Sequence, residues 1–480
     1  VEIVGSGTTA SNLRLTFTGS VRFIGEGWTN KQGKGGNPAY FYPFVIAADG
    51  GTITVPEYYD EAKTVKNCIA FTNVLVSSGG KASLSGCSFS FLTVDGGRAE
   101  LSGSVDVGGY ISTLAVQNGG ELIADGIERI TWLNVADGKA TVSAGSIGKL
   151  SVKGGTVEIS GTTVKEQVKA EGGVLTLNSC TLEQSTLVDG GSLVMNGGTL
   201  NKPTIEKGSM TVTGGMITKE ISLNGGTLNV TNAGVKGTTS VNGGTFTLGT
   251  GGRIDEHELH VNSGEAIVDG GDIVDGTFCR VIVNGGRLTL KGGQIGCMTE
   301  ICPGAHAEFN GGKYGDIWVN GKLTINGAEF QRIHPGLESR IYVYKGGEAE
   351  LNGGVYDCVH VYGDGRLTVR GGVCNSLSTV IHAWRNVTLH GGSFGEIVLP
   401  EYAGSDMSAV DWRVTFADFA SMLAPDRAYQ RHGSTSWLGT DSDMAYDQFY
   451  GDINQRMLQN VTVTGAPIGG FAAGIQLSGG

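Results

Sequence analysis

Proline and charged residues are scarce, at 9 prolines and 17% charged residues in 480. Scarce proline excludes a collagen or a proline-rich linker. No stretch reaches the roughly 18 consecutive apolar residues of a membrane-spanning helix, so no membrane span is expected. The formal net charge of -12 argues against nucleic acid or anionic lipid as the main partner, because neither would be attracted to this field.

Cysteine spacing of the kind that ligates zinc is also missing, since none of the eight cysteines forms a CxxC pair. The sequence therefore predicts no metal site, and nothing in it implies a cofactor. The chain begins at Val1 rather than at methionine, which favours a processed, exported protein. We expect it to be secreted and held at the cell surface.

Glycine, by contrast, is abundant, at 82 residues, and much of it recurs as double-glycine turns at steps of 17 or 18 residues or close multiples. One unit reads Ser222-Leu223-Asn224-Gly225-Gly226-Thr227-Leu228-Asn229-Val230, a turn between two alternating strands. Alternation buries one face of each strand, and no single unit of this size can bury its apolar face alone. The pattern predicts an all-β, parallel β-solenoid of about 18-residue coils.

The repeat divides the chain into three parts. Residues 61–400 carry the repeat and are predicted to form the parallel β-helix, whereas residues 1–60 and 401–480 lose it. An open solenoid exposes unpaired strand edges, which invite association unless they are covered. We therefore expect residues 1–60 to form an N-terminal cap and residues 401–480 to form a C-terminal cap with a strand-like tail.

The repeat region resembles two groups of right-handed parallel β-helices. Segments such as Val241-Asn242-Gly243-Gly244-Thr245 are similar to autotransporter-type adhesin passengers, and residues 415–423 and 458–463 resemble phrases that close β-helical surface proteins of anaerobic gut bacteria. The resemblance covers about residues 65–400, and it implies a right-handed solenoid. The pectin-lyase-like enzymes share this fold class.

Six cysteines lie about one coil apart in pairs, namely Cys68 with Cys87, Cys279 with Cys297, and Cys358 with Cys374. Neighbouring parallel strands are about 4.8 Å apart, which falls within the Cα separation that a disulfide tolerates. Disulfides are therefore predicted as one alternative at these positions, and a ladder of reduced thiols in the core is the other.

Aligned coils predict one outward column, beginning with Asn134, Ser151, Lys169, Leu187, Glu206, Ser222 and Ser240 and continuing with His260, Ile282, Glu300, Trp318, Tyr342 and His360. Its second half becomes aromatic, with Tyr344 and Tyr362 as a neighbouring pair. Exposed rings can stack on sugar rings or on a second subunit, and packing between coils is the alternative. The predicted binding or assembly face is Trp318, Tyr342, Tyr344, His360, Tyr362, Arg332 and Arg340.

The sequence shows no set of residues arranged as a catalytic site would need. A glycoside hydrolase needs two facing carboxylates, and a lyase needs a base beside a cation, whereas acidic residues such as Asp137 and Asp189 stand singly before glycine turns. We therefore expect a non-enzymatic extracellular solenoid, either a self-assembling subunit of a bacterial surface filament or layer or an adhesive stalk with a glycan or host-surface ligand. The alternatives are a polysaccharide lyase or glycoside hydrolase and a phage tailspike-like receptor-binding protein.

Overall fold

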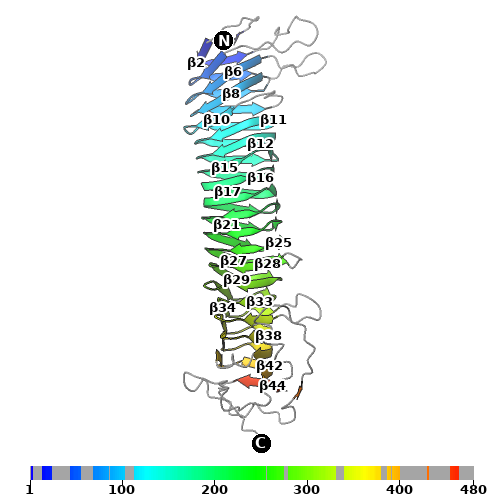
Figure 1. Cartoon of the computed structure of the whole chain (residues 1–480). Helices are drawn as coiled ribbons and strands as arrows, with labels where there is room; N and C mark the ends of the chain where they lie inside the picture. The colour runs from blue at the N-terminus through cyan, green and yellow to red at the C-terminus, as the bar shows by residue number, and fades with distance from the viewer. Residues whose placement is uncertain are drawn as a thin grey trace, which may run out of the picture. The chain divides into compact units, whose positions relative to one another are not determined.

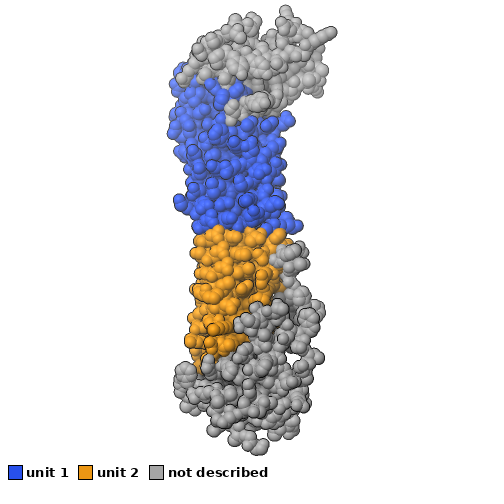
Figure 2. Space-filling model, in the orientation of Figure 1, with its two compact units in different colours: residues 1–237 blue, residues 238–480 orange. Residues whose placement is uncertain are grey.

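A computed structural model gives the fold of the chain. It describes residues 2–3, 13–23, 44–55, 69–85, 87–102, 113–255, 257–274, 279–330, 340–379, 386–390, 392–400, 430–431 and 454–463. The chain divides into two units, residues 1–237 and residues 238–480, drawn in blue and orange in Figure 2. Each unit is a stack of β-strands whose neighbours come from successive coils (Figure 1).

Alternating sequence explains why these segments are strands and which face they bury. In β13 (Thr156–Ser160) Val157 and Ile159 are fully buried, whereas Glu158 between them is exposed. Burying a Val or Ile side chain contributes roughly 1.5–3 kcal/mol, and each coil repeats this pattern. Residues one coil apart lie opposite one another, so Val157 pairs with Ala140 on one side and Leu175 on the other.

Parallel strand pairing in unit 1 forms three ladders, A, B and C, and the longer strands run through more than one of them. Ladder A consists of β2 (Leu13–Phe17), β4 (Phe44–Ala48), β6 (Ile69–Val76), β8 (Cys87–Asp95), β10 (Thr113–Gln117), β11 (Glu121–Val135), β12 (Lys139–Val152), β15 (Val168–Ala170), β17 (Thr186–Leu200), β18 (Pro203–Thr213) and β20 (Ile221–Leu223). Ladder B consists of β1 (Glu2–Ile3), β3 (Ser20–Phe23), β5 (Thr52–Val55), β7 (Lys81–Leu84), β9 (Arg98–Ser102), β11, β12, β13, β16 (Val174–Leu182), β17, β18 and β21 (Thr227–Thr231). Ladder C consists of β6, β8, β11, β12, β14 (Thr163–Val164), β16, β17, β19 (Met216–Ile217) and β22 (Gly234–Val235).

Unit 2 has the same three ladders. Ladder A consists of β23 (Thr239–Val241), β26 (Leu259–Val261), β28 (Arg280–Val283), β30 (Met298–Ile301), β33 (Ile317–Val319), β36 (Arg340–Val343), β38 (Val355–Val361), β40 (Val373–Thr379) and β42 (Gly392–Pro400). Ladder B consists of β24 (Thr245–Gly249), β27 (Glu265–Val274), β29 (Arg287–Ile295), β31 (His306–Phe309), β34 (Lys322–Ile325), β37 (Glu348–Leu351), β39 (Arg366–Val369) and β41 (Val387–Leu389). Ladder C consists of β25 (Arg253–Asp255), β27, β29, β32 (Lys313–Tyr314), β35 (Glu329–Phe330), β38, β40 and β42.

Glycine is required at the turn between ladders A and B because the turns of successive coils lie directly on one another. Gly173 has a φ of +65°, and a Cβ there would lie 2.4 Å from the carbonyl oxygen of Gly155 one coil earlier. Left-handed backbone and close approach both exclude a side chain at this position. The double-glycine repeat therefore sets the spacing at which coils stack.

The ends of the chain contain strands of two kinds. Within residues 1–60, β2 and β3 pair in parallel with β4 and β5, in line with the ladders that follow. After residue 400, β44 (Asn454–Val463) pairs antiparallel along the whole of β42, and β43 (Gln430–Arg431) pairs antiparallel with β44. The edge of β42 is thus covered by a later strand of the same chain.

The fold prediction is confirmed: the protein is an all-β parallel β-solenoid with coils of about 18 residues. No α-helix occurs in the part of the chain that the structure describes. Right-handed winding and the two cap assignments stay predictions. Of the predicted C-terminal cap and strand-like tail, residues 401–429, 432–453 and 464–480 lie outside the described residues.

Candidate functional site

The predicted aromatic column lies on the outer side of ladder A in unit 2. His260, Ile282, Glu300, Trp318, Tyr342 and His360 lie opposite one another in successive coils. Each is partly buried and stands between two buried residues of its strand, as Tyr342 does between Ile341 and Val343. The column therefore faces outward.

Five of these side chains form what we call the ring stack: Trp318, Tyr342, Tyr344, His360 and Tyr362. The Tyr344 and Tyr362 rings have centroids 5.5 Å apart and an interplanar angle of 19°, and the Tyr342 and His360 rings lie 5.4 Å apart at 20°. Tyr342 also lies 6.0 Å from Tyr344 at 18°, while Trp318 meets Tyr344 edge to face at 6.1 Å and 78°.

The tyrosine and histidine rings lie in offset stacks and cover part of each other's faces, whereas Trp318 and Tyr344 meet edge to face. Such pairs contribute about 0.5–1.5 kcal/mol beyond the area that they bury. The stack joins strands β33, β36 and β38, which belong to three consecutive coils. The ring faces are thus largely used within the chain, and this favours the packing alternative over stacking of a sugar on a row of open faces.

Polar groups hold the ring stack in place. The Arg340 Nη1 donates to the Tyr342 hydroxyl at 2.9 Å, and the Arg340 backbone N–H donates to Asp316 Oδ1 at 2.8 Å. Burial raises the pKa of the Tyr342 phenol, although the Arg340 bond acts in the opposite direction. His360 Nδ1 lies 2.5 Å from the Ser378 hydroxyl of the next coil. Arg340 therefore belongs to this face as predicted, whereas Arg332 lies outside the described residues.

The corresponding column in unit 1 has mostly small or polar side chains. Asn134, Ser151, Lys169 and Leu187 lie opposite one another as predicted. The next member is Thr204 rather than Glu206: Leu187 pairs with Thr204, and Glu206 is skipped where the register shifts between Val188 and Asp189. The column remains mostly small or polar.

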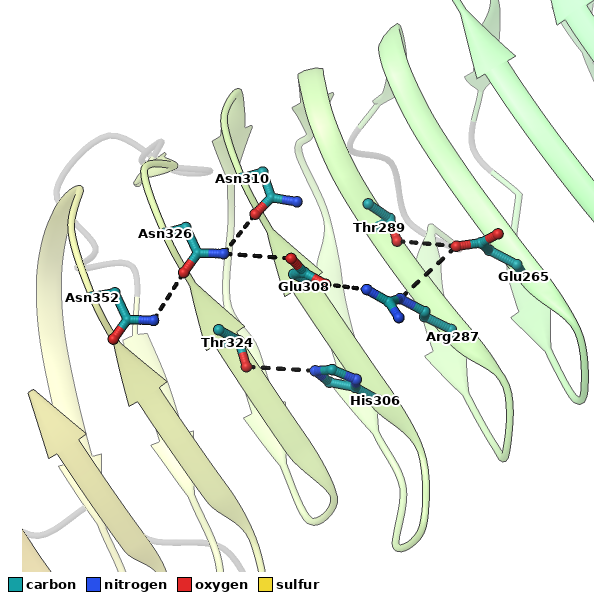
Figure 3. A network of polar contacts seen from close by, with 9 residues as sticks. All are labelled: Glu265, Arg287, Thr289, His306, Glu308, Asn310, Thr324, Asn326 and Asn352. Carbon is teal, nitrogen blue, oxygen red and sulfur yellow. Dashed lines mark hydrogen bonds and ion pairs between the residues drawn. The ribbon is translucent and has the colours of Figure 1, made fainter.

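A second polar face lies on ladder B of unit 2 (Figure 3). Arg287 bonds Glu308 of the next coil, and its Nε lies 3.8 Å from Glu265 Oε1 of the preceding coil. Asn352 Nδ2 donates to Asn326 Oδ1 at 2.8 Å, and Asn326 Nδ2 donates to Asn310 Oδ1 at 2.6 Å. Charged and amide side chains alike thus connect one coil to the next.

The same face contains His306, whose Nε2 lies 3.4 Å from the Thr324 hydroxyl of the next coil. Burial lowers the pKa of His306, and the nearby charges of Arg287 and Lys322 act in the same direction. A neutral imidazole is therefore favoured between these cations.

Two further ion pairs continue along this face. Arg366 Nη1 lies 3.2 Å from Glu348 Oε1, and Arg370 Nε lies 2.9 Å from Glu350 Oε1. Sequence reasoning missed this face because it treated acidic residues as turn formers. The available signal was the polar residue that recurs at the start of the strand after each turn, directly after a glycine at Arg287, Lys322, Glu348 and Arg366 and after Gly304-Ala305 at His306.

Cysteines are thiols where the structure describes them, at Cys180, Cys279, Cys297, Cys302, Cys358 and Cys374. Cys374 lies opposite Tyr356 rather than Cys358, so this predicted pair is two positions out of register. Cys279 and Cys297 immediately precede Arg280 and Met298, which lie opposite each other, but no disulfide joins them. Cys87 begins β8 opposite Ile69, and Cys68 lies outside the described residues.

Among the described residues, no group of three or more His, Cys, Asp or Glu side chains is placed to hold a metal ion. Within the same ranges, no helix has both the length and the apolar character needed to cross a membrane.

No protein-family model, no curated protein and no solved structure matches the chain.

Proposed function

We propose that the chain is a non-enzymatic, extracellular supporting element of a bacterial surface, a stalk rather than a polymerising subunit. The observation that carries the proposal is the use of outward side chains in unit 2. Rings, amides and arginine–glutamate pairs all bond a neighbouring coil, as Tyr344 with Tyr362, Asn326 with Asn352 and Arg366 with Glu348 do. Side chains that bond each coil to the next make the solenoid resist bending and unwinding, and a supporting element needs this stiffness.

The pairing of β44 with the edge of β42 supports the proposal of a stalk rather than an end-to-end filament. A filament that grew through this edge would need its backbone N–H and C=O groups, and β44 of the same chain already pairs with them. Extracellular location forms part of the proposal and rests on the resemblance to β-helical surface proteins.

Enzyme function is the rival. A glycoside hydrolase needs one carboxylic acid that donates a proton and a second carboxylate facing the same bond. On ladder B of unit 2, Glu308, Glu348 and Glu350 each carry an arginine partner. Because each of these glutamates is paired with an arginine, a role in linking coils is favoured over a role as the proton donor of a hydrolase.

Electron microscopy and light scattering of the full chain across a wide concentration range test the proposal. We expect separate particles of monomer mass and no cleavage of acidic polysaccharides. Filaments with a regular subunit repeat would contradict the stalk, a trimer would favour the tailspike-like alternative, and polysaccharide cleavage would overturn the non-enzymatic assignment.

Removal of residues 401–480 sharpens this test, because it deletes β44 and opens the edge of β42. The shortened chain should associate at concentrations at which the full chain stays monomeric. A shortened chain that remains monomeric would show that β44 does not protect this edge.

A further inference from the structure

A cavity of about 210 Å³ opens on the outer face of ladder B in unit 2, across strands β34, β37 and β39. We call it the trough. It is lined by Lys322, Leu323, Glu348, Ala349, Glu350, Arg366 and Thr368. Leu323 and Ala349 are buried core residues that contribute the floor, so the charged and hydroxyl side chains form the walls.

The walls are two rows of side chains that follow the coils. Lys322, Glu348 and Arg366 lie opposite one another in one row, and Glu350 and Thr368 lie opposite one another in the second. The rows are two residues apart on the same strands, so both project from the outer face of the ladder.

The trough is open because the side-chain bonds that connect neighbouring coils change direction at this point. In the preceding coils Arg287 reaches Glu308 and His306 reaches Thr324, which bridges the two rows (Figure 3). In the trough the ion pair of Arg366 runs along its own row to Glu348.

Glu350 is likewise turned away from the opposite row, because its Oε1 accepts from Arg370 beyond the trough. Among the described residues, no side-chain bond crosses from one wall of the trough to the other. The space between the rows is therefore left open to a ligand.

The lining offers both hydrogen-bond acceptors and donors. The ion pairs use Oε1 of Glu348 and of Glu350, and neither Oε2 accepts a bond from another described residue. Lys322 makes no ion pair with a described residue, and Arg366 has further N–H groups besides the one that meets Glu348. Thr368 adds a hydroxyl on the opposite wall.

Charge and size restrict the ligand. Two cationic and two anionic side chains line the trough, so a simple cation meets Lys322 and Arg366 and a simple anion meets both glutamates. The volume greatly exceeds the roughly 10–15 Å³ that one water needs but is below the about 300–1,000 Å³ of sites for drug-sized ligands. A neutral molecule of one ring, with several hydroxyls that donate to carboxylates and accept from ammonium and guanidinium groups, fits both restrictions.

We propose that the trough binds a single neutral sugar ring edge-on, with Glu348 and Glu350 accepting from its hydroxyls and Lys322 and Arg366 donating to its oxygens. The inference goes beyond the supporting role and does not depend on it. A stalk with such a site would hold a glycan through hydrogen bonds to one ring.

Saturation-transfer NMR on the full chain tests the inference, with the methyl pyranosides of glucose, galactose, mannose and N-acetylglucosamine as probes. We expect millimolar binding of at least one probe. The E350Q variant should weaken that binding about tenfold, because it replaces a charged acceptor with a neutral amide. The matched control is E308Q, which removes a carboxylate of the same outer row outside the trough.

The outcomes separate clearly. Absence of binding by all four probes at about 50 mM, where even millimolar sites fill, would overturn the inference, and so would equal binding by wild type and E350Q. Glycine, calcium and inorganic phosphate serve as charged probes, and tighter binding of any of them than of the sugars would show that the site selects charge. None of these results bears on whether the chain is monomeric or polymeric, so the inference and the supporting role fail independently.

Discussion

Units 1 and 2 share one backbone plan but differ in what their outward columns do. In unit 1 the ladder A column consists mostly of small or polar residues such as Ser151 and Thr204, whereas in unit 2 it contains the ring stack. All eight histidines also lie after residue 256, in unit 2. Parallel pairing thus places like positions side by side in both units, and the side chains decide how strongly neighbouring coils are tied.

A glycine in a closely stacked turn should show the largest effect of any single substitution. G173A places a Cβ 2.4 Å from the Gly155 carbonyl oxygen in a left-handed conformation, which itself costs about 1–2 kcal/mol. The backbone of two coils must also move apart, so we expect a total loss of about 3 kcal/mol or more. Thermal unfolding combined with hydrogen exchange across these coils measures it.

The matched control is G346A in unit 2, where φ is +83° and nothing lies within 4 Å of the added Cβ. Its stability should fall only by the cost of the left-handed conformation. Equal losses in the two variants would show that contact between stacked turns contributes nothing.

Removal of one ring should have the next largest effect. Tyr342 contacts Tyr344, His360 and Tyr362 and accepts from Arg340, so Y342A should lower the free energy of unfolding by about 2–3 kcal/mol. S151A, at the matching outward position of unit 1, should change it by less than about 0.5 kcal/mol. Similar small losses for both would remove the proposed difference between the units.

Mild acid should weaken unit 2 more than unit 1, with the smallest effect of the three. The pKa of His306 is lowered in the folded chain, chiefly by burial, so the unfolded chain takes up this proton at a higher pH. The stability that neutral His306 contributes is therefore present above about pH 6.5 and is lost as the pH falls through the lowered pKa of His306.

Hydrogen exchange of ladder B at pH 7.5 and at pH 5.5 measures this effect. Protection factors, which correct each observed rate for the slower intrinsic exchange at the lower pH, should fall around β31 and β34 at pH 5.5, and the H306Q variant should reduce the change. An equal fall in unit 1, which has no histidine, would point to another cause.

The repeat predicts the coil and much of the outward register from sequence, because hydrophobic alternation and glycine turns are local. It places Trp318, Tyr342 and His360 opposite one another correctly. It fails at Glu206, where a bulge shifts the pairing by an amount that alternation alone does not show.

Side-chain direction is the part that the sequence could not supply. The sequence left ligand binding and packing between coils as alternatives for the outward rings, and only the structure shows that their rotamers turn them onto one another. The trough depends in the same way on whether an arginine such as Arg366 bonds along its row or across it. Such choices among staggered rotamers depend on neighbours in other coils.

A double-mutant cycle on Tyr344 and Tyr362 tests the central claim, that outward side chains of unit 2 tie one coil to the next. Their rings lie 5.5 Å apart on adjacent coils, and the single and double alanine variants give the coupling between them from the free energy of unfolding. We predict a coupling of about 0.5–1.5 kcal/mol. A coupling indistinguishable from zero would contradict the claim, because the two rings would then stabilise their coils independently.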